Sequence, residues 1–283
     1  ANPAFQTREL AYVLEQSGAV ALFLVEEFRG NPMGQIGAEV AKGIKGVRVV
    51  TDMNSEALYA KGPRRSSLPT VHPSSAAMIQ YTSGTTGQPK GCQLDQVYFL
   101  TAGDWYAGLP APYDLRPGKE VMLTPLPMFH MNALAYSVMA MITTGGTLVP
   151  LDRFHPDRWT DAVSDSDATI LHYLGVMPSI LMRRPEDDRD RQHQVRFGFG
   201  AGVDRKLHAA FEARFGFPLV EAWAMTETGA GVCIAATGSK RVVGQNCFGM
   251  APSEMQTRIV AVSYTHLRAH ETLRYLVCRL LLE

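Results

Sequence analysis

One loop decides the fold of this sequence: Thr82-Ser83-Gly84-Thr85-Thr86-Gly87-Gln88-Pro89-Lys90-Gly91, which follows a predicted strand at residues 76–81. Its glycines let the backbone adopt φ > 0 and approach a ligand closely. Its hydroxyl and backbone N–H groups can donate hydrogen bonds to phosphate oxygens. Lys90 adds a cation on a mobile side chain. A loop of this composition at the end of a strand predicts a polyphosphate-binding site, placed between that strand and a helix that begins near residue 95.

The loop differs from the Walker A motif of P-loop nucleotidases. That motif requires Gly immediately before its Lys and Ser or Thr immediately after it. Here Pro89 precedes Lys90 and Gly91 follows it. The plain alternative is a flexible surface loop with incidental Ser and Thr, and the length of the pattern favours the phosphate-binding interpretation.

Outside the loop, short apolar runs alternate with segments of helical period. Strands are predicted at 19–25 (buried), 47–50, 121–123, 146–151, 169–173, 195–200 and 219–223. Helices are predicted at 8–17, 95–106, 130–143, 156–166 and 204–215, the last capped by Asp204. Residues 61–69 are predicted to form a surface connection. This alternation is typical of an α/β fold with layered, mostly parallel sheets and helices between them.

Composition excludes several classes of function. The 283 residues contain 27 Lys and Arg against 27 Asp and Glu, so a nucleic-acid partner held by basic charge is not expected. No run approaches the ~18 apolar residues of a membrane span. The four cysteines, at 92, 233, 247 and 278, form no C-x-x-C pair, which disfavours a disulfide scaffold or zinc site and favours a reducing, cytoplasmic location.

Three further blocks contain candidate site residues. His130 lies in Pro125-Leu126-Pro127-Met128-Phe129-His130, the turn Gly200-Ala201-Gly202 lies between a predicted strand and helix, and Glu221-Ala222-Trp223-Ala224-Met225-Thr226-Glu227 ends the last predicted strand. Each has a plainer interpretation: a packed histidine, a tight connection, and a core Trp beside a helix-capping Thr-Glu pair. Glu227 would offer Mg²⁺ the oxygen ligand that it prefers.

In this order, the loop and the three blocks resemble the adenylate-forming superfamily, which comprises acyl-CoA synthetases, peptide-synthetase adenylation domains and firefly-type luciferases. The resemblance implies a phosphate-binding set of Thr82, Ser83, Gly84, Thr85, Thr86, Gly87 and Lys90. It implies an adenine site at Gly200, Ala201, Gly202 and Trp223, with Thr226 on a phosphate oxygen and Glu227 on Mg²⁺. The implied catalytic residues are Lys90, Thr226 and Glu227.

The resemblance also implies an acid-binding pocket. The segment 171–178 resembles the pocket-lining strand and helix of carnitine- and crotonobetaine-CoA ligases, and the implied contacts are His130, Gly175 and Ala222. Two positions depart from the family pattern, because Trp223 stands where Tyr is usual and Ala224 where Gly is usual. His266 and His270 are four residues apart, but their surrounding sequence does not favour a metal site.

The implied reaction uses ATP and Mg²⁺ to activate a carboxylic acid as an acyl-adenylate, and then transfers the acyl group to coenzyme A. The implied domains are a partial N-terminal AMP-binding domain at 1–261 and a non-native tail at 262–283. A family member has further segments at both ends, including a small domain with a catalytic Lys, so this chain alone is expected to have little activity. Two alternatives stay open: a peptide-synthetase adenylation domain, although no acidic residue for an α-amine is found in the pocket stretches, and a non-catalytic nucleotide-binding fragment.

Overall fold

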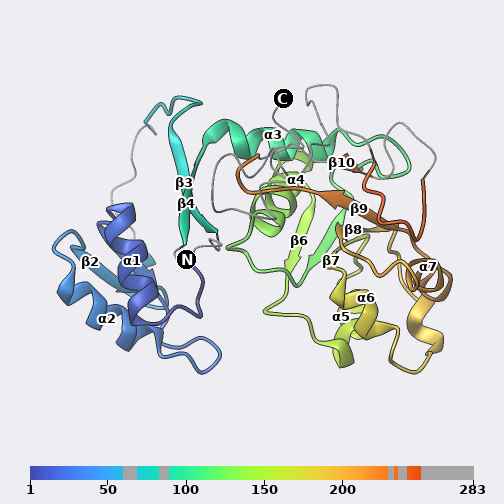
Figure 1. The fold of residues 1–283 in the computed structure, drawn as a ribbon, viewed down its shortest axis with the longest axis horizontal. Helices are drawn as coiled ribbons and strands as arrows, with labels where there is room; N and C mark the ends of the chain where they lie inside the picture. The colour runs from blue at the N-terminus through green and yellow to red at the C-terminus, as the bar shows by residue number, and fades with distance from the viewer. Residues whose placement is uncertain (60–68, 83–88, 229–232, 235–240, 250–283) are drawn as a thin grey trace, which may run out of the picture. The chain divides into compact units, whose positions relative to one another are not determined.

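The computed structural model describes residues 1–59, 69–82, 89–228, 233–234 and 241–249 (Figure 1). The chain divides into two compact units, residues 1–94 and 95–283, and each is described by itself. The predicted tail at 262–283 and most of the predicted surface connection at 61–69 lie outside the described residues.

The first unit begins with a parallel pair of strands packed on two helices. Its elements are α1 (Thr7–Ser17), β1 (Ala21–Leu24), α2 (Met33–Gly43), β2 (Val49–Asp52) and a short 3₁₀ helix, η1 (Glu56–Tyr59). Leu14 of α1 packs with Ile36 and Val40 of α2 in a small core. The predicted helix and strands are present, whereas α2 was not predicted. Strand β1 is not buried throughout as expected, because its alternate residue Phe23 faces outward and is 52% exposed.

The second part of this unit is a two-stranded sheet of β3 (Ala76–Thr82) and β4 (Lys90–Asp95). The predicted phosphate loop therefore connects two strands, and the expectation that it leads from a strand into a helix is wrong. Strand β4 forms because residues 90–95 pair with β3. Gly91 lies close to β3, since a Cβ there would lie 2.8 Å from the Ile79 side chain.

The second unit is built on one six-stranded sheet with the order β10-β9-β8-β7-β5-β6. Strands β5 to β9 are parallel, and only β10 runs antiparallel, against β9. The strands are β5 (Val121–Thr124), β6 (Thr147–Pro150), β7 (Ile170–Leu174), β8 (Phe197–Ala201), β9 (Leu219–Trp223) and β10 (Cys233–Ile234). The helices are α3 (Gln96–Ala107), the π-helix η2 (Asn132–Val138), α4 (Met139–Thr144), η3 (Pro156–Arg158), α5 (Trp159–Asp165), α6 (Val176–Leu181), η4 (Asp188–Arg191) and α7 (His208–Phe215).

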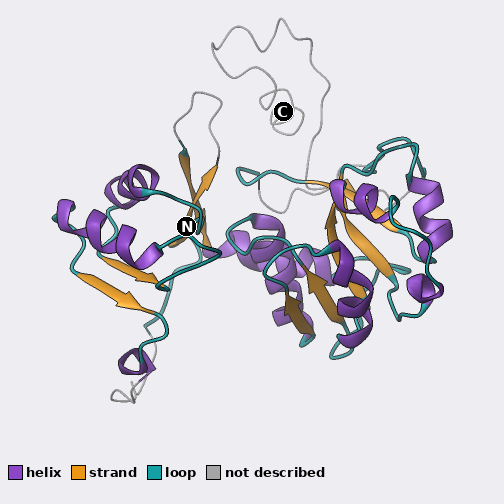
Figure 2. Ribbon diagram, turned by 90° about the horizontal axis from the view of Figure 1, so that it is seen from below, coloured by secondary structure: helices purple, strands orange, loops and turns teal. Residues whose placement is uncertain are grey.

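Helices cover both faces of this sheet (Figure 2). Successive strand residues point to opposite faces, so Met122 packs in one core and Leu123 in the other. The first core is shared with α3, η2 and α4, and the second with α5, α6 and α7. The predicted α/β fold with mostly parallel strands and intervening helices is confirmed.

Local side-chain contacts set the helix starts. Asp95 caps α3 by accepting a hydrogen bond from the Tyr98 N–H at 2.8 Å. Asp204 does not cap α7 directly, because its Oδ1 accepts from the Lys206 N–H at 2.9 Å and forms a turn. The helix proper then begins at His208, four residues later than predicted.

Candidate functional site

The carboxyl ends of neighbouring parallel strands carry most of the predicted site residues. His130 follows β5, Gly175 follows β7, Gly200 and Ala201 end β8 with Gly202 next, and Ala222 and Trp223 end β9. Because these strands are adjacent and parallel, all of these residues belong to one edge of the sheet. In open α/β sheets this is the edge at which ligands bind.

The turns after β7 and β8 touch through their backbones. The Gly175 N–H donates to the Ala201 carbonyl at 2.8 Å. A Cβ at Gly175 would lie 1.6 Å from the Gly202 carbonyl oxygen, so only glycine fits between the two turns. Gly202 has φ +80°, and a Cβ there would meet no described atom within 4 Å. The edge of this turn is therefore open, which suits a flat ring lying against it.

Glu221 supports the same turn from β9, a role that the sequence did not predict. The side chain is 4% exposed, and Oε1 accepts hydrogen bonds from the N–H groups of Gly202 at 3.1 Å and Val203 at 3.0 Å. The available signal was a carboxylate inside the otherwise apolar strand Leu219–Trp223. A buried polar side chain needs such partners, because burial without hydrogen bonds is costly.

Strand β9 ends at Trp223, and the chain continues to Thr226 and Glu227. Trp223 is half-buried and lies opposite Cys233 of β10, while Ala222 packs against the first core. Thr226 and Glu227 form a turn closed by the Thr228 N–H on the Met225 carbonyl at 3.3 Å, and Glu227 is exposed. An exposed carboxylate fits Mg²⁺, which usually takes one or two carboxylates and completes its shell with phosphate oxygens and water. In the described part of the chain, no three His, Cys, Asp or Glu residues gather as a ready-made metal cage.

His130 begins the segment that becomes the π-helix. Its ring lies 4.6 Å from the Phe129 ring, and partial desolvation lowers the pKa of its imidazole. A neutral ring of this kind suits the wall of an acid-binding pocket. The contact of His130 with an acid stays a prediction, as do those of Gly175 and Ala222.

A buried histidine network fixes this π-helix from β7. The His172 Nδ1 lies 2.7 Å from the Asn132 amide oxygen, and Nε2 lies 3.0 Å from the Tyr106 hydroxyl. The Ser137 hydroxyl also lies 2.9 Å from Nδ1, so both ring nitrogens have hydrogen-bond partners inside the core. Burial lowers the pKa of His172 to about 3, so the ring is neutral. Segment 171–178 was predicted to line the acid pocket, but His172 is fully buried and bonds Asn132 and Tyr106 instead, a network that the sequence did not predict.

The phosphate loop is described only at its two ends. Thr82 ends β3 and Lys90 begins β4, both in the first unit. The predicted phosphate ligands Ser83, Gly84, Thr85, Thr86 and Gly87 lie outside the described residues. Their approach to Glu227 in one cleft stays a prediction.

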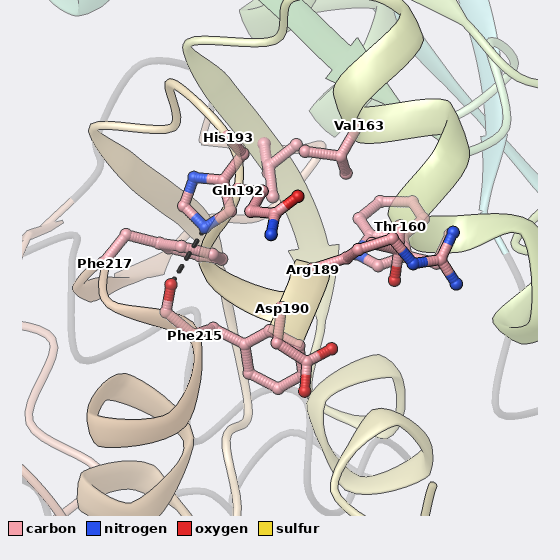
Figure 3. Close-up of a pocket in the computed structure, with 10 residues that line it drawn as sticks. Thr160, Val163, Arg189, Asp190, Gln192, His193, Phe215 and Phe217 are labelled. Atoms are coloured by element: carbon pink, nitrogen blue, oxygen red, sulfur yellow. Dashed lines mark hydrogen bonds between the residues drawn. The ribbon is translucent and has the colours of Figure 1, made fainter. Parts of the chain in front are cut away.

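A separate small pocket lies toward the opposite edge of the same sheet (Figure 3). His193 and Phe217 line it, and they precede the amino ends of β8 and β9. Two of its polar side chains are engaged internally: His193 Nε2 donates to the Phe215 carbonyl at 2.9 Å, and Asp190 accepts from Arg214 Nε at 2.7 Å. These contacts explain the pocket as part of the packing of α5 and α7.

Within the described ranges, no helix is long and apolar enough to cross a membrane.

Comparison with known proteins identifies the family of this chain. The sequence pattern of a family described as AMP-binding enzyme matches residues 1–268. The chain is 32% identical over 239 residues to a sulfoacetate–CoA ligase of Cupriavidus necator, which covers 81% of this chain and 44% of that protein. It is 31% identical over 174 residues to a crotonobetaine/carnitine–CoA ligase of Salmonella typhi, which covers 61% of this chain and 33% of that protein.

The fold has a solved counterpart. ATP-bound MatB from Rhodopseudomonas palustris superposes with a TM-score of 0.70 at 22% identity, over 92% of this chain and 50% of that one. This chain thus spans half or less of each protein named. The family match extends over nearly all of its residues, and the chain belongs to the AMP-binding enzyme family.

Proposed function

We propose that this protein uses ATP and Mg²⁺ to activate a carboxylic acid as its acyl-adenylate, and then transfers the acyl group to coenzyme A. Family membership supports the proposal. The observation that carries it is the position of Gly175, the Gly200–Gly202 turn and Trp223 at the carboxyl ends of three neighbouring parallel strands.

The chemistry has two steps. A carboxylate oxygen of the acid attacks the α-phosphorus of ATP, and pyrophosphate leaves with the electron pair of the broken P–O bond. The thiolate of coenzyme A then attacks the acyl carbon, and AMP leaves. In the first step negative charge moves onto the departing phosphates, so fixed positive charge beside them lowers the barrier.

Different residues bind the phosphates, Mg²⁺, adenine and the acid. Residues 82–87 and Lys90 hold the phosphates, and Thr226 donates to a phosphate oxygen. Glu227 holds Mg²⁺, which supplies charge neutralisation at the phosphates when bound. Gly200, Ala201, Gly202 and Trp223 enclose adenine. His130, Gly175 and Ala222 line the acid pocket, and we assign His130 a binding role there.

The proposal specifies a carboxylic acid as the substrate class and assigns no particular acid. The two related ligases are named for sulfoacetate and for crotonobetaine or carnitine, at nearly equal identity to this chain. The substrate panel therefore has to span small anionic, quaternary-ammonium, medium-chain and aromatic acids. We place the reaction in the cytoplasm, where ATP and coenzyme A are both present.

The test is acid-dependent exchange of labelled pyrophosphate into ATP by a purified protein that joins this chain to the segments that family members have at both ends, because this chain alone is expected to have little activity. Exchange that requires Mg²⁺ and one class of acid supports the proposal. Exchange that requires an amino acid instead would indicate peptide-synthetase chemistry. An absence of exchange with every acid, from protein whose unfolding is cooperative, would contradict the proposal.

A further inference from the structure

Glu221 is a buried acid with an unusual distribution of hydrogen bonds. It lies in the middle of β9, opposite Gly200 in the strand register, and is 4% exposed. Its Oε1 accepts from the backbone N–H groups of Gly202 and Val203. Its Oε2 is also buried and accepts no hydrogen bond from the residues that the structure describes. All of its described hydrogen bonding is therefore directed at one turn.

That turn is held from its other side as well. The Ala201 carbonyl accepts from Gly175 at 2.8 Å, and the Gly202 carbonyl packs against Gly175 without room for a Cβ. The turn is thus fixed between the β7–α6 connection and the Glu221 carboxylate. Gly202 has φ +80°, a conformation that glycine adopts without steric cost. Because glycine can adopt many other conformations as readily, these contacts are needed to keep the turn in one shape.

We propose that Glu221 is a positioning residue that holds the Gly200–Gly202 turn in the shape that receives adenine. This inference rests on the proposed function. Glu221 acts through the turn, because its Oε1 accepts hydrogen bonds from two consecutive backbone amides. Removing the carboxylate frees the turn and weakens nucleotide binding.

Because Oε2 accepts no hydrogen bond from the described residues, substitutions of Glu221 can test whether Oε1 alone holds the turn. Glu221→Gln keeps the accepting Oε1 and replaces only the oxygen that accepts nothing from the described residues, so it should bind ATP within threefold of wild type. Glu221→Ala removes both bonds to the turn and should raise the Kd for ATP about tenfold or more. Glu221→Asp retracts the carboxylate by one methylene, and should weaken ATP binding even if the alanine variant does not fold.

A matched control is available at the other edge of the sheet. Glu120 is 1% exposed, precedes β5, and accepts from Thr169 Oγ1 at 2.5 Å and from Arg196 at 2.7 Å. Glu120→Gln should lower the Tm and leave the Kd for ATP unchanged. The comparison separates a general loss of stability from a local effect on the turn.

The experiment is calorimetric titration of the purified protein with ATP and Mg²⁺, together with KM values for ATP and for the acid. We expect Glu221→Ala and Glu221→Asp to raise the Kd and KM for ATP more than the KM for the acid, with Glu221→Gln close to wild type. If both the Ala and the Asp variants bind ATP as tightly as the wild type, this inference is overturned and the proposed function is not affected. Equal weakening in the Glu120 control would overturn it too. A wild-type protein that binds no ATP would overturn the proposed function, and this inference with it.

Discussion

Replacing Gly175 by alanine should damage the site through its backbone. The new Cβ would lie 1.6 Å from the Gly202 carbonyl oxygen and 2.2 Å from the Gly202 carbonyl carbon. Ordinary contact begins near 3.4 Å, so the two turns would have to separate by about 2 Å. Both contacting groups are backbone, so no flexible side chain can move aside.

The expected cost lies at the upper end of the range for overpacking, about 3 kcal/mol. For a domain of this size that corresponds to a fall in Tm of roughly 6 to 12 °C. The separation would also stretch the hydrogen bond from Gly175 to the Ala201 carbonyl, so the turn predicted to hold adenine should shift. We therefore expect weaker ATP binding in addition to the lower Tm.

The assay is differential scanning calorimetry with and without ATP and Mg²⁺. Gly43→Ala is the matched control, because a Cβ at the end of α2 meets no described atom within 4 Å. The control should not lower the Tm, since Ala favours helices over Gly. If Gly175→Ala behaves like the control, the close contact between the two turns, and the account of the site built on it, is refuted.

Three further predictions concern charge, stacking and pH. Lys90→Ala and Glu227→Ala should each slow pyrophosphate exchange ~10²- to 10³-fold with little change in Tm, and rates within threefold of wild type would count against their roles. Trp223→Ala should raise the Kd for ATP about tenfold while Trp223→Phe retains most of the affinity, as expected for a stacked base; equal affinities would remove Trp223 from the site. Because the pKa of His172 falls from 6.5 to about 3 on folding, the unfolded chain binds a proton that the folded protein excludes, and stability is lost as pH falls from 6.5 toward 3. Urea unfolding should show this contribution as about 2 kcal/mol between pH 7 and 5, and His172→Gln should remove it; an unchanged pH dependence would contradict the buried neutral ring.

The strands and helices of the second unit could largely be predicted from sequence. Runs such as 169–173 and 195–200 are apolar because both faces of a parallel sheet are covered by helices. The features that were missed depend on contacts between distant residues. Strand β4 is polar and forms by pairing with β3, and the π-helix is fixed by His172 from another element.

The candidate site was predicted in part. Glycines at 200 and 202 were singled out by their pattern, and the structure gives the physical reason for the turn, the contact with Gly175. Glu221 was quoted within a motif but given no role, because its bonds to Gly202 and Val203 depend on strand register. A one-letter pattern contains no information on register across a sheet.

The most direct test of the central claim is a crystal structure of the protein with ATP and Mg²⁺ bound. We predict density for adenine against the Gly200–Gly202 turn and Trp223, with Mg²⁺ on Glu227 and the phosphates on Lys90. Adenine bound elsewhere, for example in the pocket beside His193 and Phe217, would contradict the claim that the carboxyl edge of β8 and β9 is the nucleotide site.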